Sequence, residues 1–187
     1  GDLIVPAGSL SRIGRHNALH ALAALALVSS VARIRQPVLD ALRAFTGLPH
    51  RMERLGEANG VMFVNDSKAT SVAATEVALA GIGRPVVLIA GGDGKGQSFA
   101  PLKGAVDASC RAVLLIGRDA PDVARGLTGA KATVESVGTL DAAVARALIL
   151  IDQGRLAGQP LSALAERGHL GERQLRRLFV ERLGASP

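Results

Sequence analysis

The stretch VMFVNDSKATSVAATEVALAGIGRPVVLIAGG, residues 61–92, contains the pattern that decides the fold. Four apolar residues, 61–64, lead into a polar loop. Apolar residues at helical spacing follow, and a second apolar run lies at 85–90. Short continuous apolar runs that alternate with helices are typical of parallel strands, because crossover helices cover both faces of a parallel sheet. This segment therefore predicts a strand–helix–strand unit.

The same alternation continues to about residue 148. Because the crossover between parallel strands is right-handed, the pattern predicts an α/β fold with a Rossmann-like, doubly wound, mostly parallel sheet. If later strands of such a sheet are missing, an edge and an apolar face are left uncovered. Further strands are expected at 112–116 and 132–137, and helices at 71–82, 100–108, 120–127 and 139–148.

The segment before this unit is helical and then forms a hairpin. Apolar spacing predicts helices at 17–34 and 37–45. Asn59-Gly60 stands between two short runs, which predicts a hairpin that pairs 52–57 with 61–64.

The segment after the unit differs in composition, since residues 148–187 contain no lysine but several arginines. Its spacing predicts two short helices, 161–168 and 171–184, separated by a tight turn. We therefore divide the chain into residues 1–46, 47–147 and 148–187.

Composition limits the classes of protein to which the chain can belong. Apolar residues make up 48% of its 187 residues, enough for a sizeable core, but it has no Trp and no Tyr, so stacking on nucleic-acid bases is disfavoured. The net charge of +6 favours a solvated basic surface over an anionic partner. Cys110 is the only cysteine, which excludes an internal disulfide and predicts a small core residue. No apolar run reaches the roughly 18 residues that span a bilayer, and no secretion signal is visible. We expect a cytoplasmic monomer without a membrane partner.

A glycine-rich loop, AGGDGKGQS at residues 90–98, follows one predicted strand and precedes a helix. Backbone N–H groups in such a loop can bind a phosphate or carboxylate. The loop departs from the G-x-x-x-x-G-K-[ST] pattern at Ile89 and from G-x-G-x-x-G at Gln97. The alternative is an ordinary strand–helix turn with an exposed Lys95.

A second polar loop, Asn65-Asp66-Ser67-Lys68 with Thr70, follows the strand at 61–64. If the two strands are parallel neighbours, both loops lie at one edge of the sheet. Lys68 and Lys95 would then face a common cleft suited to a dicarboxylate. In the alternative interpretation Ser67 or Thr70 caps the helix and Asp66 pairs with Lys68.

Other polar positions give weaker indications. His16 and Asn17 begin a helix, where they either cap it or bind a ligand. His50 has no carboxylate-and-serine partner set in the sequence, so a hydrolase triad is not supported. There is no His-Glu-x-x-His motif or comparable cluster, and no metal site is predicted.

Four segments of the sequence carry a resemblance to a known family. They are GRHNALHALAALAL (14–27), FTGLPHRMERLGEANGVMFVNDSKATSVAATEVALAG (45–81), LIAGGDGKGQSFAPL (88–102) and LLIGRD (114–119). Together they resemble the Mur ligase family, and within it the ligases that add D-glutamate. The resemblance implies that ATP activates the carboxylate of UDP-N-acetylmuramoyl-L-alanine as an acyl phosphate, and that the amine of D-glutamate attacks it to form an amide and release phosphate.

The resemblance implies roles for particular residues. Lys95 and Thr70 would hold the carboxylates of D-glutamate, with Lys68 beside them. The nucleotide side would be formed by Asn17, Arg51 and Asp66. ATP and Mg²⁺ are the implied cofactors. Residues 1–46 would be the helical end of the central ATPase domain, and 47–147 the Rossmann-like C-terminal domain.

The chain also departs from the family pattern. The family's phosphate-binding loop, magnesium ligands and carbamylated lysine would lie before residue 1. Its closing Ser-Pro-Ala-x-Ala-Ser-x-Asp segment is missing after Ala147. His20 and Ser71 each stand where the family has Asn. The expectation is a ligase fragment that does not turn over alone.

Residues 148–187 resemble instead the first helix-turn-helix of AraC-type regulators. That resemblance implies a small all-α tail with DNA as a possible partner. Its base or phosphate contacts would be Glu172, Arg173, Gln174 and Arg177. An amphipathic helix packed on the sheet domain is the alternative. Beside the ligase fragment, a DNA-binding regulator and a non-catalytic small-anion binding module therefore stay open as functions.

Overall fold

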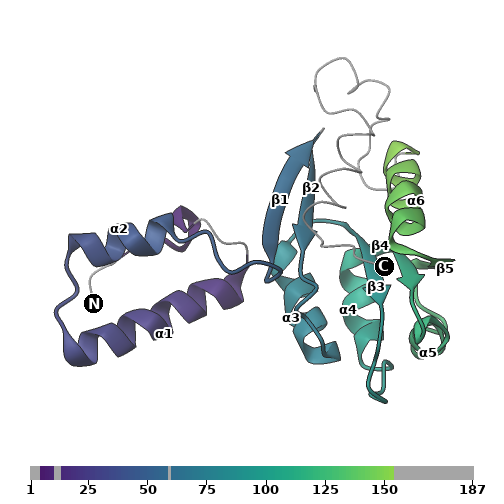
Figure 1. Ribbon diagram of the computed structural model, residues 1–187, viewed down its shortest axis with the longest axis horizontal. Helices are drawn as coiled ribbons and strands as arrows, with labels where there is room; N and C mark the ends of the chain where they lie inside the picture. The colour runs from purple at the N-terminus through teal and green to yellow at the C-terminus, as the bar shows by residue number, and fades with distance from the viewer. Residues whose placement is uncertain (1–4, 11–13, 59, 154–187) are drawn as a thin grey trace.

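The computed structural model describes residues 5–10, 14–58 and 60–153. Figure 1 shows a helical arm that projects from an α/β body. Both helices predicted for the first part of the chain are present, and Pro37 lies in the first turn of the second one, where its ring is tolerated. The arm consists of the short 3-10 helix η1 (Ala7–Ser9) and the helices α1 (Arg15–Val31) and α2 (Gln36–Ala44).

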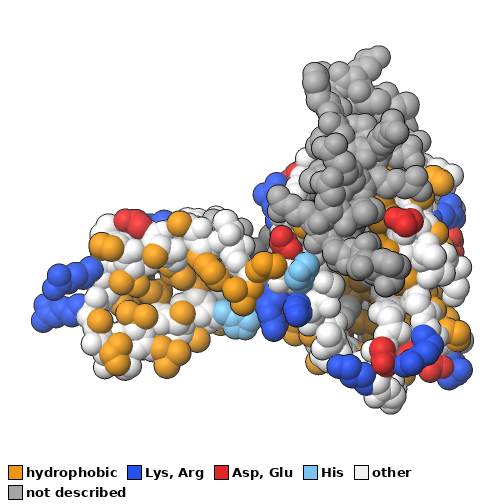
Figure 2. All heavy atoms as spheres, in the orientation of Figure 1, with side chains coloured by type: hydrophobic (Ala, Val, Ile, Leu, Met, Phe, Trp, Pro, Cys, Tyr) orange, Lys and Arg blue, Asp and Glu red, His pale blue; other side chains and the backbone are white. Residues whose placement is uncertain are grey.

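The arm buries few of its apolar side chains. Leu25 is 7% exposed, whereas Leu27 is 72% and Val31 is 86% exposed. Figure 2 shows hydrophobic side chains spread over the surface of the arm. The described part of the arm therefore has almost no core of its own.

The body is built on a parallel sheet, as the sequence predicts. Its strands are β3 (Val86–Gly91), β4 (Cys110–Ile116) and β5 (Thr133–Gly138), and β4 lies between the other two. The connecting helices are α4 (Leu102–Ser109) and α5 (Ala120–Gly126), and α6 (Leu140–Asp152) follows β5.

Side chains of β4 alternate between two apolar cores. Val113 and Leu115 pack in a core with residues of α4 and α5, and Ala112 and Leu114 pack in a second core with residues of α6. Helices therefore cover both faces of the sheet, and the doubly wound arrangement is confirmed. Cys110 is buried in the first core, as predicted, and burial raises the pKa of its thiol to about 12.

The predicted hairpin precedes this sheet. β1 (Glu53–Ala58) pairs antiparallel with β2 (Val61–Asn65), with a register shift between Arg54 and Gly56. The helix α3 (Val72–Ile82) follows β2. Ser71 caps α3, because its Oγ accepts the Ala74 N–H at 3.3 Å. The expectation that Ser67 or Thr70 caps this helix is therefore wrong, although Thr70 is the residue directly before the actual cap.

The structure differs from the sequence prediction in the position of β2. In the described part of the chain β2 pairs with β1 alone and β3 pairs with β4 alone, so the two strands lie in separate sheets. A right-handed crossover fixes the direction and hand of successive strands, but not how many strand positions lie between them. The apolar pattern therefore predicted both strands correctly and their adjacency wrongly.

Two further expectations, on membrane-spanning helices and on the helices after residue 160, can be compared with the described residues only in part. No helix in 5–10, 14–58 or 60–153 is long and apolar enough to cross a membrane. The helices predicted at 161–168 and 171–184 lie outside the described residues.

Candidate functional site

The glycine-rich loop, here residues 91–97, leaves β3 across the end of β4. Gly91 has φ 144°, and a Cβ placed on it would lie 1.8 Å from the carbonyl oxygen of Ile116. Only glycine can occupy this position without moving the backbone of β4. The Gly92 N–H donates to the same carbonyl at 3.2 Å, which fixes the start of the loop.

Two backbone N–H groups of this loop donate hydrogen bonds to aspartate side chains of the protein itself. The Gly94 N–H donates to Asp119 Oδ2 at 2.6 Å, and the Lys95 N–H donates to Asp93 Oδ1 at 2.9 Å. Arg118 forms ion pairs with both carboxylates, at 3.0 Å to Asp93 and 3.1 Å to Asp119. These two N–H groups are therefore not available to an anion, and the Lys95 ammonium is left as the loop's own cationic group.

Lys95 itself has an unusual backbone conformation. Its φ of 51° lies in the left-handed region, which side chains other than Gly, Asn and Asp rarely adopt. The hydrogen bond from Gly94 is the main reason why the pKa of Asp119 lies below its usual value, with Arg118 as the next cause. A charged Asp119 thus holds the turn that presents Lys95.

The loop after β2, residues 66–71, is joined to the segment that precedes β1. The Met52 N–H donates to Asp66 Oδ1 at 2.9 Å, and the Lys68 N–H donates to the His50 carbonyl at 3.1 Å. His50 and Met52 have φ values of 64° and 46°. The tight path of residues 50–52 thus depends on the bonds it makes to the loop after β2.

Asn65 is the buried polar residue at the centre of this junction. It is 3% exposed, its Oδ1 accepts the Ser67 N–H at 3.0 Å, and its Nδ2 lies 2.8 Å from His50 Nδ1. Because an amide nitrogen only donates, His50 Nδ1 accepts and the ring proton resides on Nε2. No pattern in the sequence predicts the Asn65–His50 pair. The one local sign of it is a buried strand that ends in an amide.

Asp66 lies in a partly dehydrated position. Burial raises the pKa of its carboxyl, and this effect outweighs the Met52 N–H and the positive charges of His16 and Arg51. Asp66 and Lys68, both within the described residues, form no ion pair. That alternative interpretation is therefore wrong.

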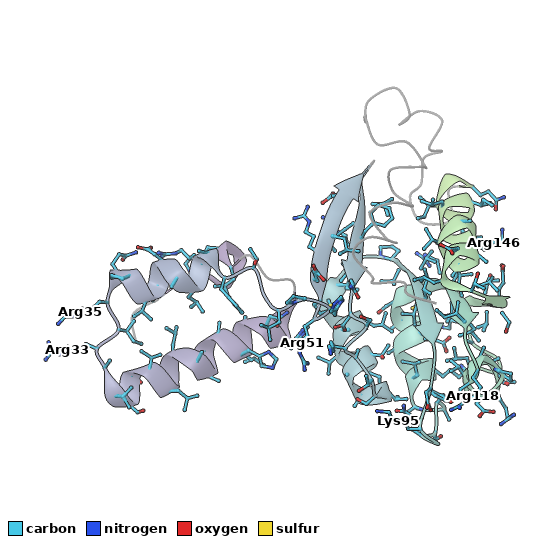
Figure 3. The ribbon with its side chains drawn as sticks, in the orientation of Figure 1. Arg33, Arg35, Arg51, Lys95, Arg118 and Arg146 are labelled. Carbon is cyan, nitrogen blue, oxygen red and sulfur yellow. The ribbon has the colours of Figure 1, made fainter. Side chains whose placement is uncertain are left out.

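The residues expected on the nucleotide side gather where the arm meets the body. Asn17 is 4% exposed in the first turn of α1, next to His16, whose charge acts on Asp66 together with that of Arg51. Figures 2 and 3 show basic and histidine side chains at this junction, with Arg51 labelled. The N-cap residue of α1 is Gly14, so neither His16 nor Asn17 occupies the N-cap position.

Gln97 ties the glycine-rich loop to the start of α3, directly after the loop that follows β2. Its Oε1 accepts the Val72 N–H at 2.9 Å and its Nε2 donates to the Gly94 carbonyl at 3.0 Å. The two loops therefore lie close together, although β2 and β3 belong to separate sheets and not to one sheet edge as predicted. In the sequence, Gln97 was noted only because it departs from the G-x-G-x-x-G pattern. Its bonds to Val72 and Gly94 could not be predicted from that pattern.

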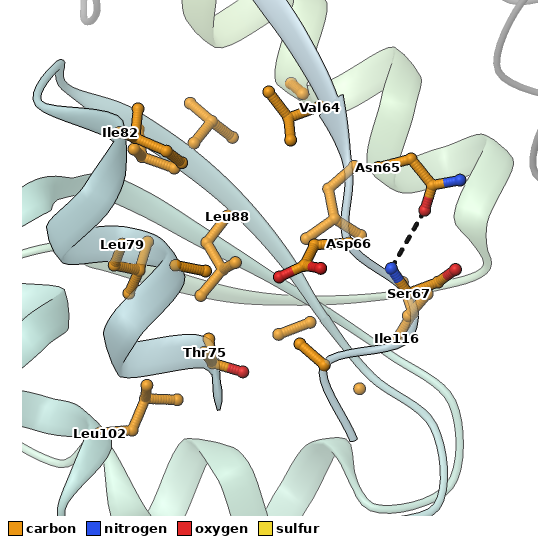
Figure 4. A pocket seen from close by; sticks show the side chains of 18 of the residues that line it. Val64, Asn65, Asp66, Ser67, Thr75, Leu79, Ile82, Leu88, Leu102 and Ile116 are labelled. Atoms are coloured by element: carbon orange, nitrogen blue, oxygen red, sulfur yellow. Dashed lines mark hydrogen bonds between the residues drawn. The ribbon is translucent and has the colours of Figure 1, made fainter. Parts of the chain in front are cut away.

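A cavity of about 750 Å³ lies behind these loops, between β2 and β3. Figure 4 shows Asp66 and Asn65 on one side of it and Leu88 and Leu79 on another. Thr70 and Asp66 line this cavity, whereas Lys68 and Lys95 do not. The structure therefore brings the two loops together without placing both ammonium groups in this space.

The described residues contain no group of three or more His, Cys, Asp or Glu side chains that could hold a metal ion. The junction instead combines a carboxylate with cationic side chains and a buried amide. Such a set can bind a polar, anionic ligand by hydrogen bonds and charge. DNA contacts expected from residues 172–177 lie outside the described residues.

Comparison with known proteins gives consistent results. The family described as "Mur ligase, glutamate ligase domain" matches residues 50–157. The UDP-N-acetylmuramoylalanine–D-glutamate ligase of Nitrosomonas europaea is 45% identical over 151 residues, which covers 81% of this chain and 32% of the relative. The corresponding ligase of Aromatoleum aromaticum is 51% identical over 148 residues, which covers 78% of this chain and 32% of the relative.

Two solved structures share the fold. The UDP-N-acetylmuramate-alanine ligase MurC of Thermotoga maritima has a TM-score of 0.60 at 20% identity, over 73% of this chain and 32% of that one. MurF of Acinetobacter baumannii has a TM-score of 0.59 at 19% identity, over 77% of this chain and 32% of that one. The chain thus spans about a third of the length of the proteins that it matches.

Proposed function

Because the chain belongs to the Mur ligase family through its glutamate ligase domain, we propose that it is part of an ATP-dependent ligase. This ligase joins D-glutamate to UDP-N-acetylmuramoyl-L-alanine in the cytoplasm, in the synthesis of peptidoglycan. The sequence identity of 45–51% to ligases named for this reaction, over about 150 residues, supports the choice of substrates. The observation in the structure that carries the proposal is the bond by which Gln97 of the glycine-rich loop is tied to the start of α3, directly after the loop that follows β2.

The chemistry requires two carboxylates of the incoming amino acid to be neutralised while its amine is aimed at an activated carbonyl. Cationic side chains held on fixed loops supply this positioning. We assign this role to Lys95 and Lys68, with the Thr70 hydroxyl as a further hydrogen-bonding group. The exposed turn of the glycine-rich loop, held by Asp119, supports the assignment of Lys95.

The nucleotide side is assigned to the junction of arm and body. Arg51 can neutralise phosphate oxygens, and Asp66 can accept hydrogen bonds from ribose hydroxyls while Asn17 contributes an amide. The proximity of Asp66 to the positive charges of Arg51 and His16 supports this grouping. We assign no Mg²⁺ ligand among the described residues, because they contain no cluster that fits one.

The domain division carries over as part of this proposal. Residues 1–46 form the end of the ATPase domain and 47–147 belong to the glutamate ligase domain. The helix-turn-helix interpretation of 148–187, with contacts by Glu172, Arg173, Gln174 and Arg177, stays a prediction. No observation in the described residues favours DNA binding over ligation.

A chimaera tests the proposed function. Residues 14–147 of this chain replace the corresponding segment of the Nitrosomonas europaea ligase, which supplies the remaining two thirds of its own length. The expected result is ATP-dependent amide formation with D-glutamate and at least a hundredfold lower kcat/KM with L-glutamate. A folded chimaera that does not ligate D-glutamate, or that prefers another amino acid, would overturn the proposal. The 187-residue chain alone is expected to be inactive.

A further inference from the structure

The turn that carries Lys95 is closed by its own backbone. The Gln97 N–H donates to the Gly94 carbonyl at 3.1 Å, and the two residues between them, Lys95 and Gly96, have φ values of 51° and 71°. Positive φ at both central positions is typical of a type I′ turn. Asp119 accepts the Gly94 N–H at 2.6 Å and ties the turn to the start of α5. The shape of this turn therefore does not need the side chain of Gln97.

The Gln97 side chain reaches from this turn to a different element. Its Nε2 donates to the same Gly94 carbonyl at 3.0 Å, and its Oε1 accepts the Val72 N–H at 2.9 Å. Val72 is the first residue of α3, where backbone N–H groups have no partner within the helix. Ser71 Oγ already accepts the Ala74 N–H. Gln97 is thus a second cap of α3, supplied from 25 residues away in the sequence.

The start of α3 also fixes the loop that carries Thr70. Thr70 is exposed and directly precedes Ser71, the N-cap residue of α3, and its N–H donates to the Lys68 carbonyl at 3.0 Å. Within the described residues, no other hydrogen bond or ion pair joins residues 66–72 to residues 91–97. The Gln97 amide is therefore the polar link, in this part of the chain, between the turn of Lys95 and the loop of Thr70.

We propose that Gln97 is a positioning residue for the amino-acid substrate. It holds the Lys95 ammonium at a fixed distance from the Thr70 hydroxyl, so that both groups reach the carboxylates of one D-glutamate molecule. Two groups on separate loops bind a small dianion well only if the distance between them is fixed before binding. This inference rests on the proposed function, and it requires no contact between Gln97 and the substrate.

Steady-state kinetics of the chimaeric ligase test this role. Gln97→Met keeps the length of the side chain but removes both of its hydrogen bonds, so the turn keeps its shape and loses its link to α3. We expect the KM for D-glutamate to rise about fivefold or more, while kcat and the KM for ATP change less than about twofold. Gln36→Met is the matched control, because the Gln36 amide is exposed and bonds to Asp40 on α2. It should leave all three values unchanged.

A double-mutant cycle shows whether Gln97 acts through Lys95. In the Lys95→Ala chimaera the group that Gln97 positions is gone, so Gln97→Met should raise the KM for D-glutamate by less than about twofold. An equal fold increase in both backgrounds would contradict the proposal, since Gln97 would then act independently of Lys95. Equal rises in the KM values for ATP and D-glutamate would also overturn it, because they indicate general loosening. So would a KM for D-glutamate that does not differ between Gln97→Met and Gln36→Met.

Amide hydrogen exchange of the 187-residue chain tests the link to α3 without any activity. In Gln97→Met the Val72 N–H should exchange about tenfold faster than in wild type, whereas the Gly94 N–H, held by Asp119, should keep its protection. Unchanged exchange at Val72 would overturn the link itself. A parent chimaera that does not ligate D-glutamate would instead overturn the proposed function, and the role toward D-glutamate with it, while exchange at Val72 still decides whether the link exists.

Discussion

Two parts of the site present a loop from the carboxyl end of a strand, but different forces hold them. The loop after β2 is tied by the buried amide of Asn65 and by Asp66, whose pKa is raised by burial. The glycine-rich loop is tied by Asp119, whose pKa is lowered by the Gly94 N–H and by Arg118. Both carboxylates accept one backbone N–H, so the N–H alone does not set the direction of the shift.

This difference shows that dehydration decides how the two loops respond to substitution and to pH. At Asp66, burial outweighs every favourable charge, whereas at Asp119 hydrogen bonds and an adjacent guanidinium outweigh burial. Loss of a buried group should therefore be costly in the first loop. In the second loop, steric fit of the glycines should matter more than any exposed ion pair.

The largest effect is expected from Gly91→Ala in the glycine-rich loop. Its Cβ would lie 1.8 Å from the Ile116 carbonyl oxygen, so the backbone of β4 or the loop must move. We expect a loss of about 3 kcal/mol or more in the free energy of unfolding, measured in urea. Gly96→Ala, also at positive φ but with open space around its Cβ, should lose only about 1–2 kcal/mol. Equal losses would show that the close approach to Ile116 is unimportant.

The next effect is expected from Asn65→Leu in the loop after β2. The substitution leaves the Ser67 N–H and His50 Nδ1 without their amide partner. An unsatisfied buried group costs about 1–3 kcal/mol, so the free energy of unfolding should fall by about 2 kcal/mol. The exposed amide of Gln36 bonds to Asp40, and Gln36→Ala should change stability by less than about 0.5 kcal/mol. If Asn65→Leu loses as little stability as Gln36→Ala, the buried amide does not hold the loop after β2, and the proposed difference between the two loops is wrong.

The pH dependence of stability should differ in sign between the two carboxylates. The folded pKa of Asp119 is depressed, so its contribution is present above the unfolded value of 3.8 and is lost as pH falls further. The folded pKa of Asp66 is raised, so its ionisation destabilises the protein at neutral pH and this penalty disappears as pH falls toward 3.8.

Urea unfolding of Asp119→Asn and Asp66→Asn from pH 7 to pH 3 measures these contributions. The free energy of unfolding of wild type should exceed that of Asp119→Asn at neutral pH, and this excess should shrink below about pH 4. Relative to Asp66→Asn, the free energy of unfolding of wild type should instead rise as pH falls from 7 toward 4. Two curves with the same slope would contradict the assigned causes.

The smallest effect is expected from Arg118→Ala. Its side chain is 73% exposed although it pairs with Asp93 and Asp119. Exposed ion pairs contribute about 0–1 kcal/mol, so stability should change by about 0.5 kcal/mol and less still in 1 M salt. A loss comparable to that of Asn65→Leu would show that the exposed ion pairs, not steric fit, hold the glycine-rich loop.

Much of the fold could be predicted from apolar periodicity and turn residues. The run at 112–116 is apolar on both faces, which indicated a strand covered by helices on both sides, and in the structure it is β4, between β3 and β5. Asn59-Gly60 indicated the hairpin of β1 and β2. The separation of β2 from β3 could not be predicted, because a single sequence contains no measure of how many strand positions a crossover spans.

The site was less predictable than the fold. Asp66 lies near the charges of Arg51 and His16, and Asn17 is buried beside His16, but their roles on the nucleotide side stay predictions. Asn65, His50 and Gln97 act through contacts between segments far apart in the sequence, and no local pattern reports such contacts. The occupation of two loop N–H groups by Asp93 and Asp119 was hidden for the same reason.

The most direct test of the central claim is the KM for D-glutamate of the chimaeric ligase with Lys95→Ala. Lys103→Ala is the matched control, because Lys103 lies on α4 outside both loops and pairs with Asp107 at 2.7 Å. The account predicts that Lys95→Ala raises the KM for D-glutamate at least thirtyfold, an effect of about 2 kcal/mol, with the KM for ATP little changed. Equal KM values for D-glutamate in the Lys95→Ala and Lys103→Ala chimaeras would contradict it.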